Sequence, residues 1–247
     1  MSEVLDVEKT IDKWNETFTS NARKPLQDLS RYNTETLEWL MMEHFQFSFR
    51  NCQFLWDAAQ TAAAFDTDAV NKELVRNYKE ESGHAALYKA ALLKVGSDVE
   101  ARQEFKPTTH FLDSIGKLCH REPSFVLGLM FATETAAIFE HQVFRDVSVE
   151  VISRLAAGDA GKPLVGFHDL HLEGVEQSHK DELGIFLRDI YAGQHVVSKQ
   201  DNRPTIYPQQ ALEGGREGID LMAEWWGKLF AEMNEMSKGK MVHAMAV

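Results

Sequence analysis

The chain contains two short motifs of the same form, Glu81-Ser-Gly-His84 and Glu176-Gln-Ser-His179. Each motif places a glutamate and a histidine three positions apart. Residues with this spacing share one face of a helix, so each motif can direct a carboxylate and an imidazole toward one point. The two motifs therefore predict two helices that each present a metal-binding pair, and they decide the fold that we expect.

A single glutamate precedes each motif within an apolar stretch: Glu43 before the first and Glu134 before the second. Ten residues without a charge separate Pro123 from Glu134. Burying such a carboxylate is costly unless it binds a metal, pairs with a buried arginine or stays protonated. For Glu43 the alternative is a helix face that reaches solvent. The resulting order, Glu, Glu-x-x-His, Glu, Glu-x-x-His, is typical of a carboxylate-bridged di-iron or di-manganese site.

Other ligand-type side chains lie close to these residues. His171 precedes Glu176 by five residues, which a regular helix does not align, but a π-type bulge or local unwinding does. We therefore count His171 as a further metal ligand or as a supporting partner. Glu140 and His141 follow Glu134 on the same helix, and we expect them to support the ligands. Glu80 is a rival to Glu81, but its helical neighbours are polar and suggest a solvated face.

Three more residues are candidates for contact with substrate or with the ligands. Tyr78 and Tyr88 share the predicted helix face of Glu81 and His84. Arg50 lies further along the Glu43 face, where it either holds a substrate carboxylate or pairs with a structural acid. Gly83 interrupts the first motif within a predicted helix, and a small residue there allows close approach of a neighbouring helix or of substrate.

Helical periodicity dominates the 247 residues, and we expect one all-α domain over residues 1–247 with a metal-binding core at about 34–195. The predicted helices form a seven-helix bundle and span about 5–22, 34–64, 68–95, 109–119, 123–157, 163–191 and 209–237, with a loop at 197–208. An Asn33 or Thr34 cap opens the second helix, and Pro123 opens the fifth. The 44% hydrophobic content suffices for a large core.

The composition argues against several classes of protein. A formal net charge of −12 without a basic cluster disfavours nucleic-acid binding. No uninterrupted apolar run is long enough for a membrane span, and no signal peptide is evident at Met1. Cys52 and Cys119 lie in apolar contexts and are expected to be free thiols, which favours a cytoplasmic location. They are too few for an iron–sulfur cluster, and no glycine-rich dinucleotide motif is present.

The segments Asn77–His84, Gly128–Glu134 and His171–His179 resemble the haem-oxygenase-like di-metal oxidases. This family shares the seven-helix fold of haem oxygenase, thiaminase II and pyrroloquinoline quinone synthase. The resemblance covers about residues 34–195 and implies two irons bound by Glu43, Glu81, His84, Glu134, Glu176 and His179. One departure concerns the last helix, where the family often has an aspartate four residues after a histidine. Here Val175 occupies that place, which leaves the role of His171 open.

The resemblance also implies an activity. Family members use dioxygen to oxidise small substrates that carry a carboxylate or an amine, such as fatty acids or amino acids, in natural-product pathways. The outcomes include desaturation, C–C cleavage and N-oxygenation. Electrons come from the substrate or from an external donor. Iron and manganese both accept these ligands, so the sequence does not separate them. It also leaves the oligomeric state open, a homodimer included.

Three alternatives remain at this stage. A ferritin-like ferroxidase or iron-binding protein has the same order of ligands. A thiaminase-like enzyme uses the same fold without a cofactor, but needs a cysteine nucleophile in an activating context. A helical interaction protein without catalysis predicts that alanine at Glu134 and His179 leaves function intact.

Overall fold

The computed structural model describes residues 6–188 and 202–244. Nine α-helices lie within these two ranges: α1 (Val7–Arg23), α2 (Thr34–Ala62), α3 (Ala69–Glu81), α4 (His84–Lys94), α5 (Lys106–Leu118), α6 (Pro123–Arg154), α7 (Lys162–Leu170), α8 (Glu176–Leu187) and α9 (Pro208–Ala244). If α3 with α4 and α7 with α8 are each counted as one interrupted helix, the nine helices make seven. The predicted seven-helix, all-α architecture is confirmed.

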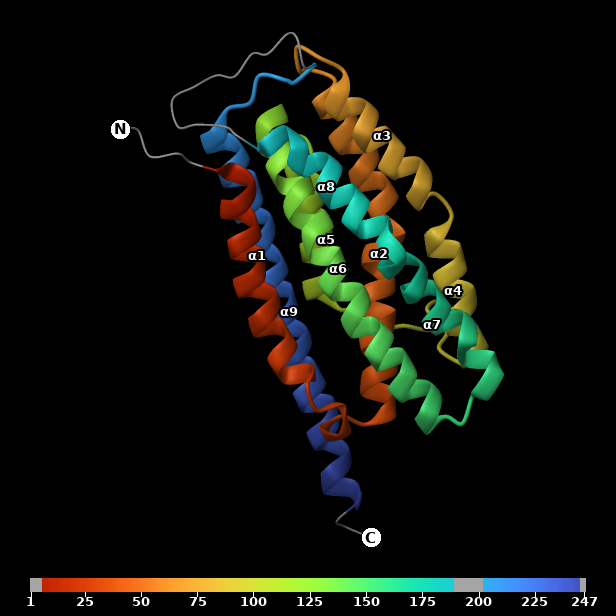
Figure 1. Cartoon of the computed structure of the whole chain (residues 1–247). Coiled ribbons are helices and arrows are strands. Elements are labelled where there is room, and N and C mark those ends of the chain that lie inside the picture. The colour runs from red at the N-terminus through yellow and green to blue at the C-terminus, as the bar shows by residue number, and fades with distance from the viewer. Residues whose placement is uncertain (1–5, 189–201, 245–247) are drawn as a thin grey trace.

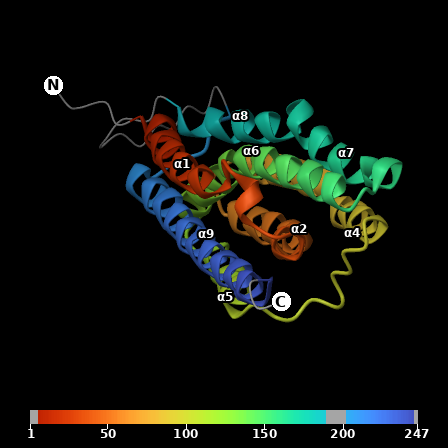
Figure 2. The same cartoon turned by 90° about the horizontal axis from the view of Figure 1, so that it is seen from below.

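The long helix α6 forms the centre of the bundle (Figures 1 and 2). It contacts α1, α2, α7, α8 and α9. Its first half, up to Thr133, is apolar and buried on every side, whereas its second half also carries charged residues that reach the surface, such as Asp146. Two glycines bring α9 close to it. A Cβ atom at Gly128 would overlap the Ala211 carbonyl oxygen, and one at Gly214 would overlap that of Phe125. The backbones of α6 and α9 are therefore in direct contact.

The helix starts follow from local sequence signals. Asn33 caps α2, and its Oδ1 accepts a hydrogen bond from the Thr36 amide at 2.9 Å. Pro123 begins α6. Pro107 occupies the first turn of α5, which therefore begins at Lys106 rather than near residue 109. Helix α9 also continues beyond the predicted end near residue 237.

The prediction of one helix over residues 68–95 is wrong. Helix α3 ends at Glu81, and Gly83 adopts a left-handed conformation with φ of 100° before α4 begins at His84. Left-handed backbone is cheap for glycine and terminates a helix. Figure 1 shows the change of direction between α3 and α4.

A second break separates α7 from α8, so the prediction of one helix over residues 163–191 is also wrong. The break is of the kind, a π-type bulge or local unwinding, that aligns His171 with Glu176. Residues His171–Val175 (η4) form a π-helical segment, in which Gly174 has φ of 115°. The segment inserts one residue into the helical repeat. The predicted end of this helix near residue 191 and the first part of the predicted loop, residues 197–201, lie outside the described residues, whereas residues 202–207 are non-helical as predicted and lead into α9.

Across the described ranges, no helix combines the length and the apolar character that crossing a bilayer requires.

Candidate metal centre

A small cavity of about 30 Å³ lies between α2, α3, α4, α6 and the η4–α8 segment. This volume accommodates a water-sized or ion-sized occupant. Carboxylates and imidazoles from the two motif regions and from α6 line it. Phe47, Ser48 and Asn51 on α2 and Thr133 and Ala137 on α6 complete the lining with His44 and Phe167.

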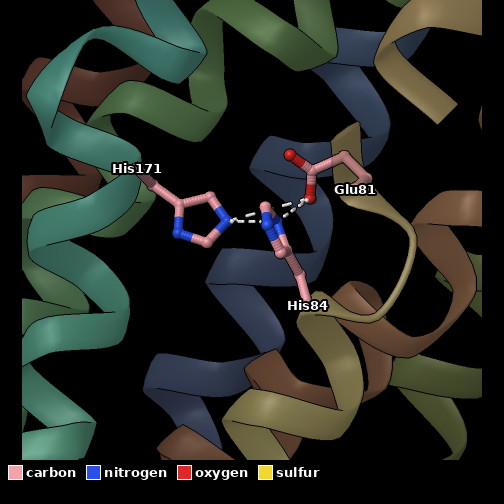
Figure 3. Close-up of side chains that lie close together, drawn as sticks. All are labelled: Glu81, His84 and His171. Carbon is pink, nitrogen blue, oxygen red and sulfur yellow. Dashed lines mark hydrogen bonds and ion pairs between the residues drawn. The ribbon is translucent and has the colours of Figure 1, made fainter. Parts of the chain in front are cut away.

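Glu81 and His84 meet across the α3–α4 break, not along one regular helix. Glu81 Oε2 lies 3.0 Å from His84 Nδ1. The left-handed residue Gly83 turns the chain between them, so the motif still converges on one point. Figure 3 shows both side chains together with His171.

His171 reaches this pair from the π-helical segment. Its Nδ1 lies 2.7 Å from the Phe167 carbonyl oxygen, and a carbonyl only accepts, so this nitrogen carries the proton. The bare Nε2 then faces His84 Nδ1 at 3.1 Å and Glu81 Oε2 at 3.7 Å. A hydrogen bond from the ring nitrogen that does not face the metal fixes metal-binding histidines in the correct tautomer.

A second group lies deeper in the bundle. His179 Nδ1 is 3.2 Å from Glu134 Oε2 and 3.8 Å from Glu176 Oε2. On its other side, His179 Nε2 lies 3.0 Å from Glu80 Oε2. Glu80 also accepts a hydrogen bond from Arg76 Nη1 at 2.9 Å. Sequence reasoning set Glu80 aside as solvated. It is partly exposed, but it holds the outer edge of the imidazole.

The ligand-type atoms form three overlapping groups, each with its atoms within 4.8 Å of one another: Glu81, His84 and His171; His141, His171 and Glu176; Glu134, Glu176 and His179. His171 and Glu176 each belong to two groups. The groups therefore form one continuous row rather than three separate sites. A row of this kind is long enough to hold two metal ions that share ligands.

Charge interactions within the row are strong. Burial, then the charges of Glu134 and Glu81, raises the pKa of Glu176 well above its usual value. Burial alone would lower the pKa of His179, but the adjacent Glu134 carboxylate outweighs this effect, and the pKa rises to about 10. Without a metal, the protonated imidazole supplies positive charge next to the buried Glu134 and Glu176 carboxyl groups.

The residues present fit a pair of metal ions. Glu81 Oε1 is buried and has no hydrogen-bond partner within the described parts of the chain, which costs about 1–3 kcal/mol. Glu81 Oε2 and His171 Nε2 both lie close to His84 Nδ1, so the three ligand-type atoms surround one position. Ligand atoms around a small divalent ion lie roughly 3–4 Å apart, since each metal–ligand bond is about 2.1 Å long. Mixed imidazole and carboxylate donors suit iron and manganese.

Behind the row lies a buried polar network that the sequence indicated only in part. His141, expected to be a supporting residue, faces Glu176 Oε1 at 3.4 Å through Nε2. Its Nδ1 lies 3.1 Å from His168 Nδ1.

Glu140 accepts a hydrogen bond from Trp226 Nε1 at 3.1 Å, and burial raises its pKa to about 7. Glu140 Oε2 is also 3.9 Å from His44 Nε2.

The structure does not bring Glu43 into the row. Its carboxylate is fully buried and lies 3.0 Å from Arg102 Nη1. Its neighbour His44, which sequence reasoning did not select, lines the cavity instead. Arg102 lies between α4 and α5 in a segment without helical periodicity, so the sequence carried no sign of this pairing.

The other three candidates are also placed away from the ligands. Arg50 lies 3.8 Å from Asp113 and above the Phe54 ring, on the side of α2 that faces α5. Tyr78 packs on Trp56. The Tyr88 hydroxyl contacts His44 Nδ1 at 3.2 Å, and this buried tyrosine therefore supports the inner network.

Comparisons with known proteins identify the fold. No protein-family model and no curated protein sequence matches the chain. A CADD-like protein of unknown function from Nostoc punctiforme is similar over 91% of this chain and 99% of its own, with a TM-score of 0.68 and 20% identity. A domain of unknown function with a heme oxygenase-like fold from Shewanella denitrificans matches 91% of this chain and 90% of its own, with a TM-score of 0.63 and 13% identity. A TenA homolog from Pseudomonas syringae matches 90% and 92%, with a TM-score of 0.68 and 10% identity. The chain therefore has the haem-oxygenase-like fold that its motifs predicted.

Proposed function

We propose that the protein is a non-haem di-metal oxidase or oxygenase that uses dioxygen to oxidise a small substrate carrying a carboxylate or an amine. The observation that carries this proposal is the continuous, buried row of carboxylates and imidazoles. Glu81, His84, Glu134, His171, Glu176 and His179 would hold two irons, or two manganese ions. The bound pair would supply the electrons and the oxidising power that these side chains lack.

The surrounding residues prepare the site for this role. The Phe167 carbonyl holds His171 with its bare nitrogen toward the row, and Glu80 holds His179 from outside. Phe47 lines the cavity, whose volume is only about 30 Å³. Glu140 retains a proton near neutral pH beside the row, because burial raises its pKa to about 7.

A second cavity provides a place for substrate. It is a hollow open to the surface, with a volume of about 480 Å³ and an exposed Phe49 in its lining. Apolar residues such as Phe45, Phe49 and Ala86 line it together with Gly83 and the polar side chains of Gln46, Lys89 and Glu100. Pockets for small organic ligands have about this size. We assign the substrate to this cavity because it adjoins the segment that carries Glu81 and His84. Oxidation of a natural-product precursor, with an external electron donor, is consistent with this arrangement.

The alternatives receive less support. A thiaminase-like reaction needs a reactive thiolate. Burial, then the charge of Glu81, raises the pKa of Cys52, and burial raises that of Cys119 to about 12. Both thiols are therefore poor nucleophiles. A ferritin-like protein is a four-helix carboxylate bundle, whereas this chain has the haem-oxygenase-like fold.

Anaerobic loading of metal-free protein with iron(II), followed by dioxygen, tests the proposal. We expect two irons per chain, a transient visible absorption, and faster dioxygen consumption with one member of a panel of fatty acids and amino acids. Glu134→Ala and His179→Ala should lose iron and activity. Ala86→Trp, which fills the apolar cavity, should raise KM and leave the iron stoichiometry unchanged. Absence of stoichiometric iron binding would refute the proposal.

A further inference from the structure

The row contains one imidazole more than the two sequence motifs and His171 account for. His141 lies two helical turns after Glu134 on α6, so both side chains face the same side of that helix. The bundle core thus receives two ligand-type groups from α6 instead of one. His141 is buried, and its Nε2 atom points at Glu176, a carboxylate shared by two of the groups.

The distances around His141 suit an ion. Its Nε2 lies 3.4 Å from Glu176 Oε1, and ligand atoms of His141, His171 and Glu176 all lie within 4.8 Å of one another. Donor atoms about 2.1 Å from one divalent ion are separated by roughly 3–4 Å. The 3.4 Å separation is long for a strong hydrogen bond to a carboxylate, but it is of the size that two ligands of one ion show.

The His141 ring is also held in place. It stacks on His171 with a centroid separation of 4.0 Å and an interplanar angle of 11°. Its inner nitrogen, Nδ1, lies 3.1 Å from His168 Nδ1. One of these two nitrogens must donate and the other accept. If His141 donates, its Nε2 is bare and available as a ligand. The proton of neutral His168 then lies on Nε2, which is buried and has no hydrogen-bond partner among the described residues.

We infer that His141 is a fourth imidazole ligand of the metal pair, that His168 fixes its tautomer, and that this extra nitrogen makes the site prefer iron over manganese. The inference rests on the proposed di-metal function and extends it to the choice of metal. Iron(II) binds nitrogen donors more strongly than manganese(II) does, whereas carboxylate-rich sites suit manganese. With His84, His141, His171 and His179, imidazoles outnumber the three carboxylates.

Competition titrations test this inference without measuring activity. Metal-free protein is titrated anaerobically with iron(II) or manganese(II) against a chromophoric chelator. His141→Ala should weaken iron(II) binding by at least as much as the loss of a residue that only supports a ligand. Loss of such a supporting residue typically costs about 10–100-fold in metal affinity. Manganese(II) binding should weaken less. His141→Glu should retain binding and shift the preference toward manganese(II).

Variants of His168 and an unrelated histidine serve as controls. His168→Asn retains a hydrogen-bond acceptor near the Nδ1 position, so its iron(II) affinity should stay close to that of the wild type. His168→Leu removes the acceptor and should weaken iron(II) binding. His110→Ala, at an exposed position on α5, should have no effect. If the His141 variants do not fold, proton NMR of the cobalt(II)-loaded wild type replaces them. Four imidazole N–H signals with paramagnetic shifts are expected, one for each histidine ligand. Only three such signals would overturn the inference.

The outcomes separate this inference from the proposed function. Wild-type affinity for both metals in His141→Ala, with two ions still bound, overturns the role of His141 and leaves the di-metal site intact. A wild-type protein that binds no metal overturns the proposed function, and the inference fails with it. A fall in affinity that is equal for iron and manganese contradicts the selectivity.

Discussion

His171 Nε2 lies 3.1 Å from His84 Nδ1, although 87 positions separate the two residues along the chain. Each of them lies next to a break in a helix. His84 begins α4 directly after Gly83, and His171 begins the π-helical segment that contains Gly174. The contact therefore depends on two local departures from regular helix, each made by a glycine with positive φ.

Substitution of Gly174 should disturb the centre more than the fold. A Cβ atom at this position meets no neighbour, so Gly174→Ala introduces only backbone strain at φ of 115°, of about 1–2 kcal/mol. Relief of that strain moves His171 relative to Glu176, and iron(II) affinity should fall. Gly166→Ala on α7 is the matched control, because it has regular helical backbone and equal space; it should stabilise by about 0.5–1 kcal/mol. Urea unfolding and iron titrations measure both effects. Unchanged iron affinity in Gly174→Ala would contradict this account.

Glu80 should influence metal binding although we do not count it as a ligand. Its carboxylate contacts His179 Nε2 at 3.0 Å, and such outer partners contribute about 10–100-fold to metal affinity. We therefore expect Glu80→Gln to weaken iron(II) binding by this factor. Glu73→Gln is the control, because Glu73 binds the same arginine, Arg76, at 3.1 Å without contacting His179. Equal effects of the two substitutions would assign the loss to Arg76 instead.

Stability of the metal-free protein should fall as the pH rises through the titration of Glu140. Burial raises the pKa of this carboxyl from 4.5 to about 7, so between these values the folded state binds more protons than the unfolded chain. The free energy of unfolding then decreases with rising pH. Relative to Glu140→Gln, the wild type should lose on the order of 3 kcal/mol between about pH 4.5 and pH 8. Urea unfolding in the presence of a chelator measures the difference. A constant difference across this range would show that Glu140 titrates normally.

Much of the fold follows from local signals in the sequence. Asn33 as a cap, Pro123 in a first turn and the apolar run before Glu134 each act through neighbouring residues, so their positions predicted α2 and α6 correctly. Gly83 was also visible, but a glycine inside a helical pattern is compatible with either close packing or a break. Only its left-handed φ separates the two cases, and backbone conformation at one residue depends on the packing of whole helices.

The candidate site was predictable where its residues lie on periodic helices. Glu81, His84, Glu134, Glu176 and His179 lie together as expected, and the five-residue offset of His171 indicated the π-helical segment. The inner partners were harder to find. His44 and His168 contribute through contacts between different helices. His168 belongs to the stretch 168–179, which is rich in ligand-type side chains, but its spacing did not reveal its contact with His141, and nothing in the local sequence distinguishes His44 from an ordinary core histidine.

Variants of the Glu43–Arg102 pair test whether Glu43 is a structural residue or a metal ligand. Both side chains are almost fully buried, and Glu43 Oε1 lies 3.0 Å from Arg102 Nη1. Burial nevertheless raises the pKa of the Glu43 carboxyl to about 7, and neither of its oxygens accepts a hydrogen bond from the described residues. Removing one partner of a buried ion pair typically costs about 3–5 kcal/mol, because the remaining charge has no compensation. We expect Arg102→Ala to destabilise the protein by about this amount in urea unfolding, and Glu43→Gln in the same chain to recover part of the loss.

Neither change should alter the iron stoichiometry, because Glu43 belongs to none of the three metal-ligand groups. Glu43→Gln alone is the decisive variant, since it keeps the shape of the side chain and removes its charge. Two irons per chain would confirm that the carboxylate is structural. Loss of one iron with unchanged stability would instead make Glu43 a ligand, and α2 would then have to move toward the row when metal binds.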